Sequence, residues 1–204
     1  MKKILIIVGP SGTGKTTLGN YLKELGWVEF ISHTTRKIRE TEIPDVDYYF
    51  VSKEKFMETE KVEYTEYAGN YYGLSVKEVD EKINKYNNCY CIVEKNGALN
   101  LKKIYPYAKV IFVYNTPKVL KERMKERGGD ENVIKNRINN IFRTKELENY
   151  KYADIIIRNS DLNVAKKQID KALAGNMFFN NLIHKIYLII INIIYKFKIS
   201  CFKN

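Results

Sequence analysis

The chain has 204 residues, a net charge of +11 and only three cysteines. This length fits one domain with its own hydrophobic core, and three cysteines are too few for a disulfide framework. The positive charge is not arranged in a recognised basic–aromatic motif, so no nucleic-acid partner is expected. Because the first predicted strand begins at Lys3, no signal peptide is expected, and we predict a cytoplasmic protein.

The first predicted element is a buried strand over 3–8, and the sequence GPSGTGKTT follows it at once. This matches G-x-x-x-x-G-K-[ST], a phosphate-binding loop between a strand and a helix. Gly12 and Gly14 let backbone N–H groups turn toward phosphate oxygens. Lys15 can reach the outer phosphates, and the Thr16 hydroxyl can hold Mg²⁺. We therefore predict nucleoside triphosphate binding by Gly9, Ser11, Gly12, Thr13, Gly14, Lys15, Thr16 and Thr17.

The remaining pattern alternates helices and strands. Helices are predicted over 15–25, 53–60, 76–86, 117–127, 131–149 and 161–174, and strands over 27–31, 48–51, 89–93, 110–114, 155–157 and within 62–73. This alternation predicts an α/β fold of three layers with a parallel central sheet. The segment 32–75 is β-rich and has a hairpin signal at Gly69-Asn70. We expect it to be an inserted lobe in a domain over 1–175, whose core is 1–31 and 76–175.

A candidate acceptor site lies in the inserted lobe. Arginine is scarce, with seven among 35 basic residues, yet Arg36 and Arg39 lie three apart, with Tyr48 and Tyr72 following. Planar guanidinium groups beside tyrosine hydroxyls suit the double charge of a phosphate monoester. A carboxylate such as Glu63 suits guanine, because its N1–H and N2–H₂ groups are adjacent donors. The lobe therefore predicts a purine monophosphate as phosphate acceptor.

These segments resemble the guanylate kinases, whose pattern is S-x-T-T-R-x-x-R-x-G-E…D-Y-x-F and E-[WY]…G-x-Y-Y-G-[ST]. The resemblance runs from Lys3 to about Ala174. It implies Mg²⁺-dependent phosphorylation of GMP and dGMP by ATP, through positioning and charge neutralisation. It also implies a GMP site that comprises Ser32, Arg36, Arg39, Tyr48, Glu63, Tyr72 and Glu94.

The resemblance extends to a helical lid over about 124–137. Arg123, Arg127 and Arg137 match the lid and its flanks, and Gly128-Gly129 is a natural hinge. Cations that arrive on closure stabilise charge on the phosphoryl group in transfer. The expected catalytic set is Lys15, Arg39, Arg123, Arg127 and Arg137. Asn159 matches a family position near the adenine of ATP.

Three positions depart from the family pattern. Ile92-Val93-Glu94 stands where the family has Asp-x-Asp, so one acid is lost and the other is longer. Leu74 replaces a Ser or Thr that is expected to contact guanine, and Thr41 replaces a glycine. We expect the change at Thr41 to have little consequence, and the other two to affect rate and base selectivity rather than fold. Two alternatives therefore stay open: a kinase of this fold with another monophosphate acceptor, and a binding module with weak catalysis.

Residues 176–204 differ in composition from the rest. Asn, Ile, Lys, Phe and Tyr supply 23 of these 29 residues, which include four lysines and no acid. The longest apolar stretch, 186–195, contains Asn192 and falls short of the roughly 18 residues that would suggest a membrane span. Three hypotheses remain: a helix that associates with a membrane surface or another apolar surface, a segment packed on the domain, or an unselected extension. The sequence does not indicate an oligomeric state.

Overall fold

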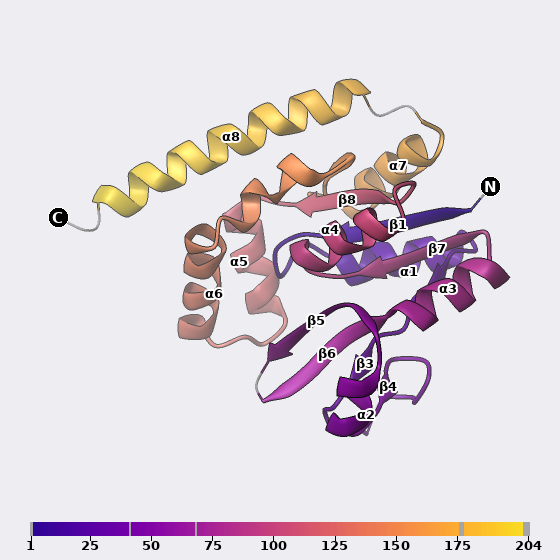
Figure 1. The fold of residues 1–204 in the computed structure, drawn as a ribbon. Helices are drawn as coiled ribbons and strands as arrows, with labels where there is room; N and C mark the ends of the chain where they lie inside the picture. The colour runs from indigo at the N-terminus through magenta and orange to yellow at the C-terminus, as the bar shows by residue number, and fades with distance from the viewer. Residues whose placement is uncertain (1, 41, 68, 176–177, 202–204) are drawn as a thin grey trace. The chain divides into compact units, whose positions relative to one another are not determined.

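The computed structural model describes residues 2–40, 42–67, 69–175 and 178–201 (Figure 1). The chain divides into two compact units. The first unit comprises residues 1–6 and 19–109, and the second comprises 7–18 and 110–204. Thr41 lies outside the described residues, so the structure does not test the expectation about its replacement. For Cys201 the structure describes the backbone alone.

A five-stranded sheet has the order β2-β7-β1-β8-β9. Its strands are β1 (Lys3–Val8), β2 (Val28–Glu29), β7 (Asn88–Ile92), β8 (Lys109–Tyr114) and β9 (Ile155–Arg158). The pairs β2–β7 and β8–β9 are parallel. β1 and β8 are near-continuous apolar runs, as expected for strands that are covered on both faces. The α/β fold with a central parallel sheet is confirmed.

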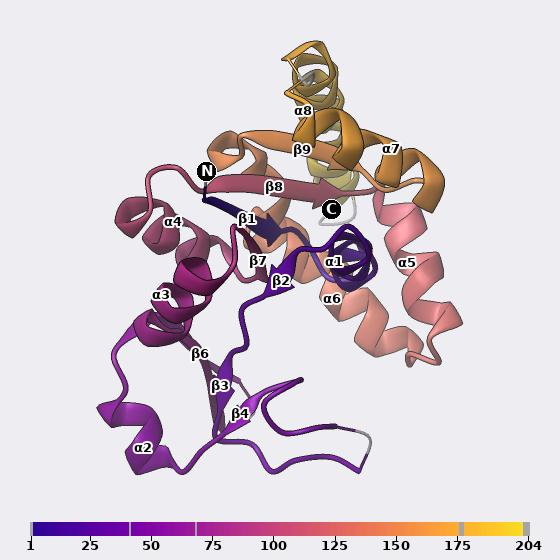
Figure 2. The ribbon, with the colours of Figure 1, turned by 90° about the vertical axis from the view of Figure 1, so that its right-hand side faces the viewer.

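The inserted lobe belongs to the first unit and has its own sheet, of order β4-β3-β6-β5. Its strands are β3 (His33–Thr34), β4 (Tyr49–Phe50), β5 (Lys61–Tyr67) and β6 (Asn70–Ser75), and α2 (Lys53–Glu58) follows β4 in the chain (Figure 1 and Figure 2). β5 and β6 form the predicted antiparallel hairpin, and Gly69 takes a positive φ of 74° in its turn. The β-rich character of 32–75 is confirmed.

The first unit also contains α3 (Val76–Lys85) and α4 (Lys95–Ile104). The sequence prediction missed α4. The residue at its N-cap is Glu94 rather than the usual Ser, Thr, Asp or Asn, so the sequence carries no start signal for this helix. The Glu94 side chain makes no cap hydrogen bond. The helix is held instead by packing, with Ala98 and Leu101 buried and the Asn100 amide donating to the Val62 carbonyl at 3.0 Å.

The second unit carries α5 (Pro117–Glu126), α6 (Glu131–Arg143), a 3₁₀ helix η1 (Glu146–Tyr152), α7 (Leu162–Leu173) and α8 (Phe178–Cys201). The single helix predicted over 131–149 is wrong. α6 ends at Arg143, and Lys145 takes a left-handed φ of 56°, which interrupts the helix before η1. Ile141 and Leu147 are both buried on either side of this break, and no Gly or Pro lies between them to mark the turn in the sequence.

α1 (Lys15–Glu24) follows the phosphate-binding loop and ends as predicted before Gly26, whose φ is 82°. Cys89 and Cys91 of β7 are buried and free, in agreement with the expectation of reduced thiols. Burial raises the pKa of the Cys89 thiol to about 11, which keeps it protonated at neutral pH. No described helix is both long enough and apolar enough to cross a membrane.

Candidate active site

The phosphate-binding loop lies between β1 and α1 and depends on its glycines. Gly12 and Gly14 have φ values of 84° and 85°, a region that other residues rarely adopt. Position 9 requires glycine because there is no space for a side chain: a Cβ there would lie 2.1 Å from the carbonyl oxygen of Val113 in β8. The loop therefore packs its backbone against β8 before it turns into the helix, and the glycines keep the N–H groups of its turn accessible.

Lys15 begins α1 and turns back over the loop. Its ammonium donates to the Gly9 carbonyl at 2.6 Å and to the Pro10 carbonyl at 3.2 Å. The Thr13 hydroxyl is fully buried and donates to the Pro10 carbonyl at 2.8 Å, so this hydroxyl holds the turn of the loop. The other three hydroxyl-bearing residues of the predicted set, Ser11, Thr16 and Thr17, are exposed.

Asn159 follows β9 and is almost fully buried. Its amide donates to the Thr13 carbonyl at 2.8 Å, and a Cβ at Gly14 would lie 2.3 Å from the amide nitrogen. Asn115 donates to the Asn159 carbonyl, a second link that the sequence did not reveal. Asn159 therefore supports the loop backbone. Its Oδ1 atom is buried and unpaired among the described residues, and its predicted place near adenine stays a prediction.

The three lid arginines occupy different positions in the second unit. A Cβ at Gly14 would lie 3.7 Å from Nη1 of Arg123, so α5 brings this guanidinium to the phosphate-binding loop. Arg127 caps the C-terminus of α5, and Arg137 lies on α6; both are exposed. Gly128 takes a φ of 76° in the turn between the two helices. The structure thus places Arg123 at the loop and leaves Arg127 and Arg137 on the surface of the expected lid.

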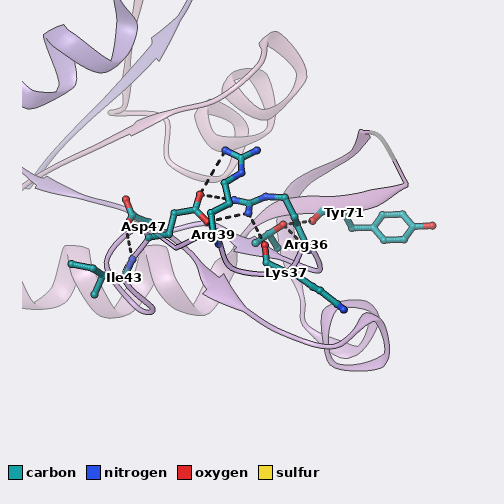
Figure 3. Close-up of polar contacts among 8 residues, drawn as sticks. Arg36, Lys37, Arg39, Ile43, Asp47 and Tyr71 are labelled. Carbon is teal, nitrogen blue, oxygen red and sulfur yellow. Dashed lines mark hydrogen bonds and ion pairs between the residues drawn. The ribbon is translucent and has the colours of Figure 1, made fainter.

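The acceptor cluster lies in the lobe of the first unit (Figure 3). Arg36 forms a two-pronged ion pair with Glu42, with Nη1–Oε2 at 3.0 Å and Nη2–Oε1 at 2.7 Å. Both side chains are mostly buried, at 13% and 14% exposed. The Nε atom of Arg36 is buried and has no hydrogen-bond partner among the described residues. Glu42 thus fixes the guanidinium plane and leaves one buried donor unused.

Arg39 approaches the same carboxylate. Its backbone N–H donates to Oε2 of Glu42 at 2.9 Å, while its side chain is 70% exposed. Hydrogen bonds from Arg36 are the main cause that holds the pKa of Glu42 below its ordinary value, so this carboxylate is ionised at neutral pH. Glu42 therefore holds both arginines: the exposed Arg39 guanidinium has its Nη1 atom 3.9 Å from Oε1 of the same carboxylate (Figure 3).

Aromatic side chains complete the cluster. The Arg36 guanidinium lies 5.7 Å from the Tyr48 ring centre, and the Tyr48 and Tyr72 rings meet edge to face at 6.0 Å. The hydrogen bond with Glu42 is the main reason that the pKa of Arg36 is raised, and a hydrogen bond with Tyr72 raises this pKa further. Tyr71 points away and stacks on the buried Phe56 at 5.6 Å. Tyr71 therefore packs within the lobe, and Tyr72 faces the arginine.

Glu63 lies on β5, opposite Leu74 of β6. Burial, and next the negative charge of Glu94, raise the pKa of Glu63 to about 7. Its side chain lies against Gly97 in the first turn of α4, where a Cβ would be 2.5 Å from Cγ. Ser32 is half-buried, and its carbonyl accepts from the Tyr49 N–H at 2.9 Å.

Comparisons with known proteins agree on one family. The guanylate kinase family model matches residues 1–176. The guanylate kinase of Synechocystis sp. (strain ATCC 27184 / PCC 6803 / Kazusa) is 35% identical over 179 residues, which are 84% of this chain and 93% of that protein.

The chain belongs to the guanylate kinase family. The crystal structure of guanylate kinase from Anaplasma phagocytophilum is similar to it, with a TM-score of 0.64, 25% identity and 87% of each chain covered. The family predicted from the phosphate-binding loop and the lobe motifs is therefore confirmed, and α8 lies beyond the residues that the family model matches.

The departures from the guanylate kinase pattern have structural counterparts. Leu74 is fully buried, so the side chain that replaces the family hydroxyl is a core residue opposite Glu63. The neighbouring Ser75 hydroxyl accepts from the Glu78 N–H at 3.1 Å and caps α3, so it is already in use. Glu94 is exposed at the N-terminus of α4, after Ile92.

Three residues of the site escaped the sequence analysis. Glu42 orients Arg36, Gly97 makes room for Glu63, and the buried Glu78 accepts from the Ile31 N–H at 2.8 Å and the Tyr49 hydroxyl at 2.9 Å. Glu42 had a signal, because it is an acid three residues after Arg39 in a basic segment. Gly97 and Glu78 had none, because their partners are distant in sequence.

Proposed function

We propose that this guanylate kinase family member transfers the terminal phosphoryl group of ATP to GMP or dGMP, with ADP and GDP or dGDP as products. The observation that carries the proposal is the state of Arg36. Its buried guanidinium is oriented by Glu42, it lies beside Tyr48, and it retains an unpaired Nε donor. A phosphate oxygen is the acceptor that this donor suits best.

On the acceptor side, the first unit supplies all the proposed GMP-binding groups. Arg36, the exposed Arg39, Tyr48 and Tyr72 would hold the monophosphate, with charge-assisted hydrogen bonds from the guanidinium groups. Glu63 would accept from the adjacent N1–H and N2–H₂ donors of guanine, and Ser32 would contact the same base. Ionisation of Glu63 is the condition for this recognition, because a protonated carboxyl offers one acceptor fewer.

On the donor side, the second unit supplies the proposed ATP-binding groups. The backbone N–H groups of Gly9 and of residues 11–17, which include the N-terminus of α1, would hold the phosphate chain. Lys15 would leave the loop carbonyls, which it contacts at 2.6 and 3.2 Å, for the stronger attraction of phosphate oxygens. Arg123 already lies beside Gly14. Arg127 and Arg137 would join it when the lid closes, and Asn159 would lie near adenine.

The chemistry needs no covalent intermediate. A phosphate oxygen of GMP attacks the terminal phosphorus of ATP, and the bond from that phosphorus to the bridging oxygen of ADP breaks. Lys15, Arg39 and the lid arginines would neutralise the charge that spreads over the transferred group. The remaining contribution is alignment, because the reacting atoms must be held about 3–3.5 Å apart.

We propose Mg²⁺ as the cofactor of this reaction. Thr16 is exposed in the first turn of α1, beside Lys15, and its hydroxyl is the kind of oxygen ligand that Mg²⁺ accepts. This metal keeps several waters and takes its other ligands from substrate phosphates, so a single protein hydroxyl fits it. When bound, Mg²⁺ would withdraw charge from the phosphate oxygens. Glu94 would bind water molecules of the metal ion, or would contact the acceptor GMP.

The free, buried Cys89 and Cys91 support a reducing compartment, and we propose the cytoplasm as the place of the reaction.

A coupled assay of ADP release with GMP, dGMP, AMP, UMP and CMP tests the proposed function. We expect turnover with GMP and dGMP and at least about tenfold less with the others, because an unpaired buried carboxylate disfavours bases without the donor pair. Equal turnover with AMP would overturn guanine selectivity. No turnover with any acceptor, together with retained GMP binding, would identify a binding module instead.

A further inference from the structure

The helix α8 lies beyond the guanylate kinase family match, and one of its faces is fixed to the second unit. Nδ1 of His184 forms a hydrogen bond of 2.8 Å with the hydroxyl of the buried Tyr114. The Arg158 guanidinium lies 4.6 Å from the Tyr187 ring centre, and Leu188 is fully buried. These contacts to β8 and β9 show that α8 packs on the domain through this inner face.

The opposite face of α8 is apolar and exposed. Leu182 and six isoleucines between Ile183 and Ile194 have side chains that are 47% to 63% exposed. Their spacing of three and four residues places them on one side of the helix. Figure 1 shows α8 as a long helix with a single straight axis. Because the exposed residues recur from Leu182 to Ile194, they form one strip along this axis. We call this strip the outer face. Large exposed apolar patches mark interaction sites.

The second unit, to which α8 belongs, has a strongly positive net charge. The second unit contains 19 of the 35 Lys and Arg residues and 9 of the 24 Asp and Glu residues, so its net charge is +10, against +1 for the first unit. Residues 176–204 contain four lysines and no acid. Lys185 is exposed within α8, and helical spacing puts it, together with Asn192, at one border of the outer face.

We propose that the outer face of α8 binds the surface of an anionic lipid bilayer. An exposed aliphatic face bordered by lysine is the arrangement of helices that lie in the membrane interface, with their apolar side chains at the boundary between headgroups and acyl chains. Charge selects this occupant over a second copy of the chain. Two second units would bring two charges of +10 together, whereas an anionic surface attracts each one.

Vesicle sedimentation of the full chain tests the proposal. We expect binding to vesicles of phosphatidylcholine mixed with phosphatidylglycerol, and at least about tenfold weaker binding to pure phosphatidylcholine or in high salt, which screens the lysines. The double substitution Ile186→Glu and Ile190→Glu should weaken binding at least about tenfold, because it places two acids in the outer face. The single change Lys185→Glu should weaken it about fivefold or more.

The matched control is Ile104→Glu with Val164→Glu, two aliphatic side chains of α4 and α7 that are each 48% exposed. This control should bind vesicles like the parent, and all variants should keep GDP formation, which reports the fold. Absence of parent binding, or undiminished binding by the Ile186/Ile190 variant, would overturn the proposal. A parent that is dimeric in sedimentation velocity without lipid, and that Ile186→Glu with Ile190→Glu makes monomeric, would identify a second copy as the occupant instead.

Discussion

Gly97 makes the space that the Glu63 side chain occupies: a Cβ at position 97 would lie 2.5 Å from Cγ and 2.8 Å from Cδ of that glutamate. The two residues belong to α4 and β5, and both lie in the first unit. The proposed guanine acceptor is therefore positioned by the absence of a side chain on a neighbouring helix.

Gly97→Ala should displace Glu63 and raise the KM for GMP about tenfold, because small misplacements of a positioning group are costly. The KM for ATP should change less than about twofold. Alanine is the better helix former, so a loss cannot come from helix propensity. Asn96→Ala, which truncates an exposed side chain in the same helix turn, is the control. An unchanged KM for GMP would show that Glu63 does not depend on this space.

The pKa of about 7 at Glu63 predicts a pH-dependent affinity for GMP. The carboxyl is largely protonated at pH 6 and ionised at pH 8, so GMP affinity should rise through pH 7 and then level off. The GMP phosphate also titrates in this range. Glu63→Gln isolates the contribution of the protein: the variant should bind GMP more weakly, with a flatter profile. Calorimetric titration at several pH values measures this, and parallel profiles would refute it.

The same shift predicts how stability depends on pH. The pKa of Glu63 in the folded chain is raised above the ordinary value of 4.5. The contribution of its protonated carboxyl to the free energy of unfolding is therefore complete below pH 4.5 and is lost as the pH rises through 7. The melting temperature of Glu63→Gln minus that of the parent should therefore be larger at pH 8 than at pH 5. Thermal unfolding of both proteins without nucleotide, at the two pH values, provides the check. A pH-independent difference would mean that the carboxyl titrates normally.

Glu42→Ala should release Arg36 from its fixed plane. We expect a rise of about tenfold in the KM for GMP, because the oriented donors to the phosphate are lost, and little change in the KM for ATP. Glu40→Ala, which removes an exposed acid from the same loop, is the control. Steady-state kinetics with each substrate varied in turn separates the two effects. Equal losses for both substrates would point to a general disturbance of the fold.

Lys15→Ala should lower turnover at least about a hundredfold with the fold intact, because a cation that stabilises transition-state charge typically contributes that much. Lys118→Ala, at an exposed position of α5, should have no comparable effect. Circular dichroism shows whether the loop variant is folded. Retention of more than about a tenth of the parent's turnover would mean that Lys15 does not have the proposed role.

A chain that ends at Gly175 should keep its kinase activity, because the family match covers residues 1–176. It should also melt at a lower temperature, since it loses the buried Leu188 and Ile191, each worth about 1.5–3 kcal/mol when fully buried. Calorimetry and the ADP-release assay measure the two properties. An unfolded or inactive product would place α8 inside the enzyme.

Elements whose signals are local could be predicted from the sequence. The phosphate-binding loop could be identified because Gly12 and Gly14 need positive φ values and Lys15 must follow them at fixed spacing. The hairpin turn at Gly69 follows from the same kind of short-range requirement. These signals can be recognised in the sequence because the residues that interact are close in the chain.

Other features became visible only in the folded chain, because the residues that interact are far apart in sequence. Gly97 serves Glu63 across 34 positions, and Asn159 supports Thr13 across 146. The end of α6 at Arg143 and the existence of α4 depend on packing that outweighs weak or misleading local signals. For α8, composition suggested three possibilities, and its contacts with Tyr114 and Arg158 showed that one face is packed while the other is exposed. Burial is a property of the folded chain, so only the fold could separate the two faces.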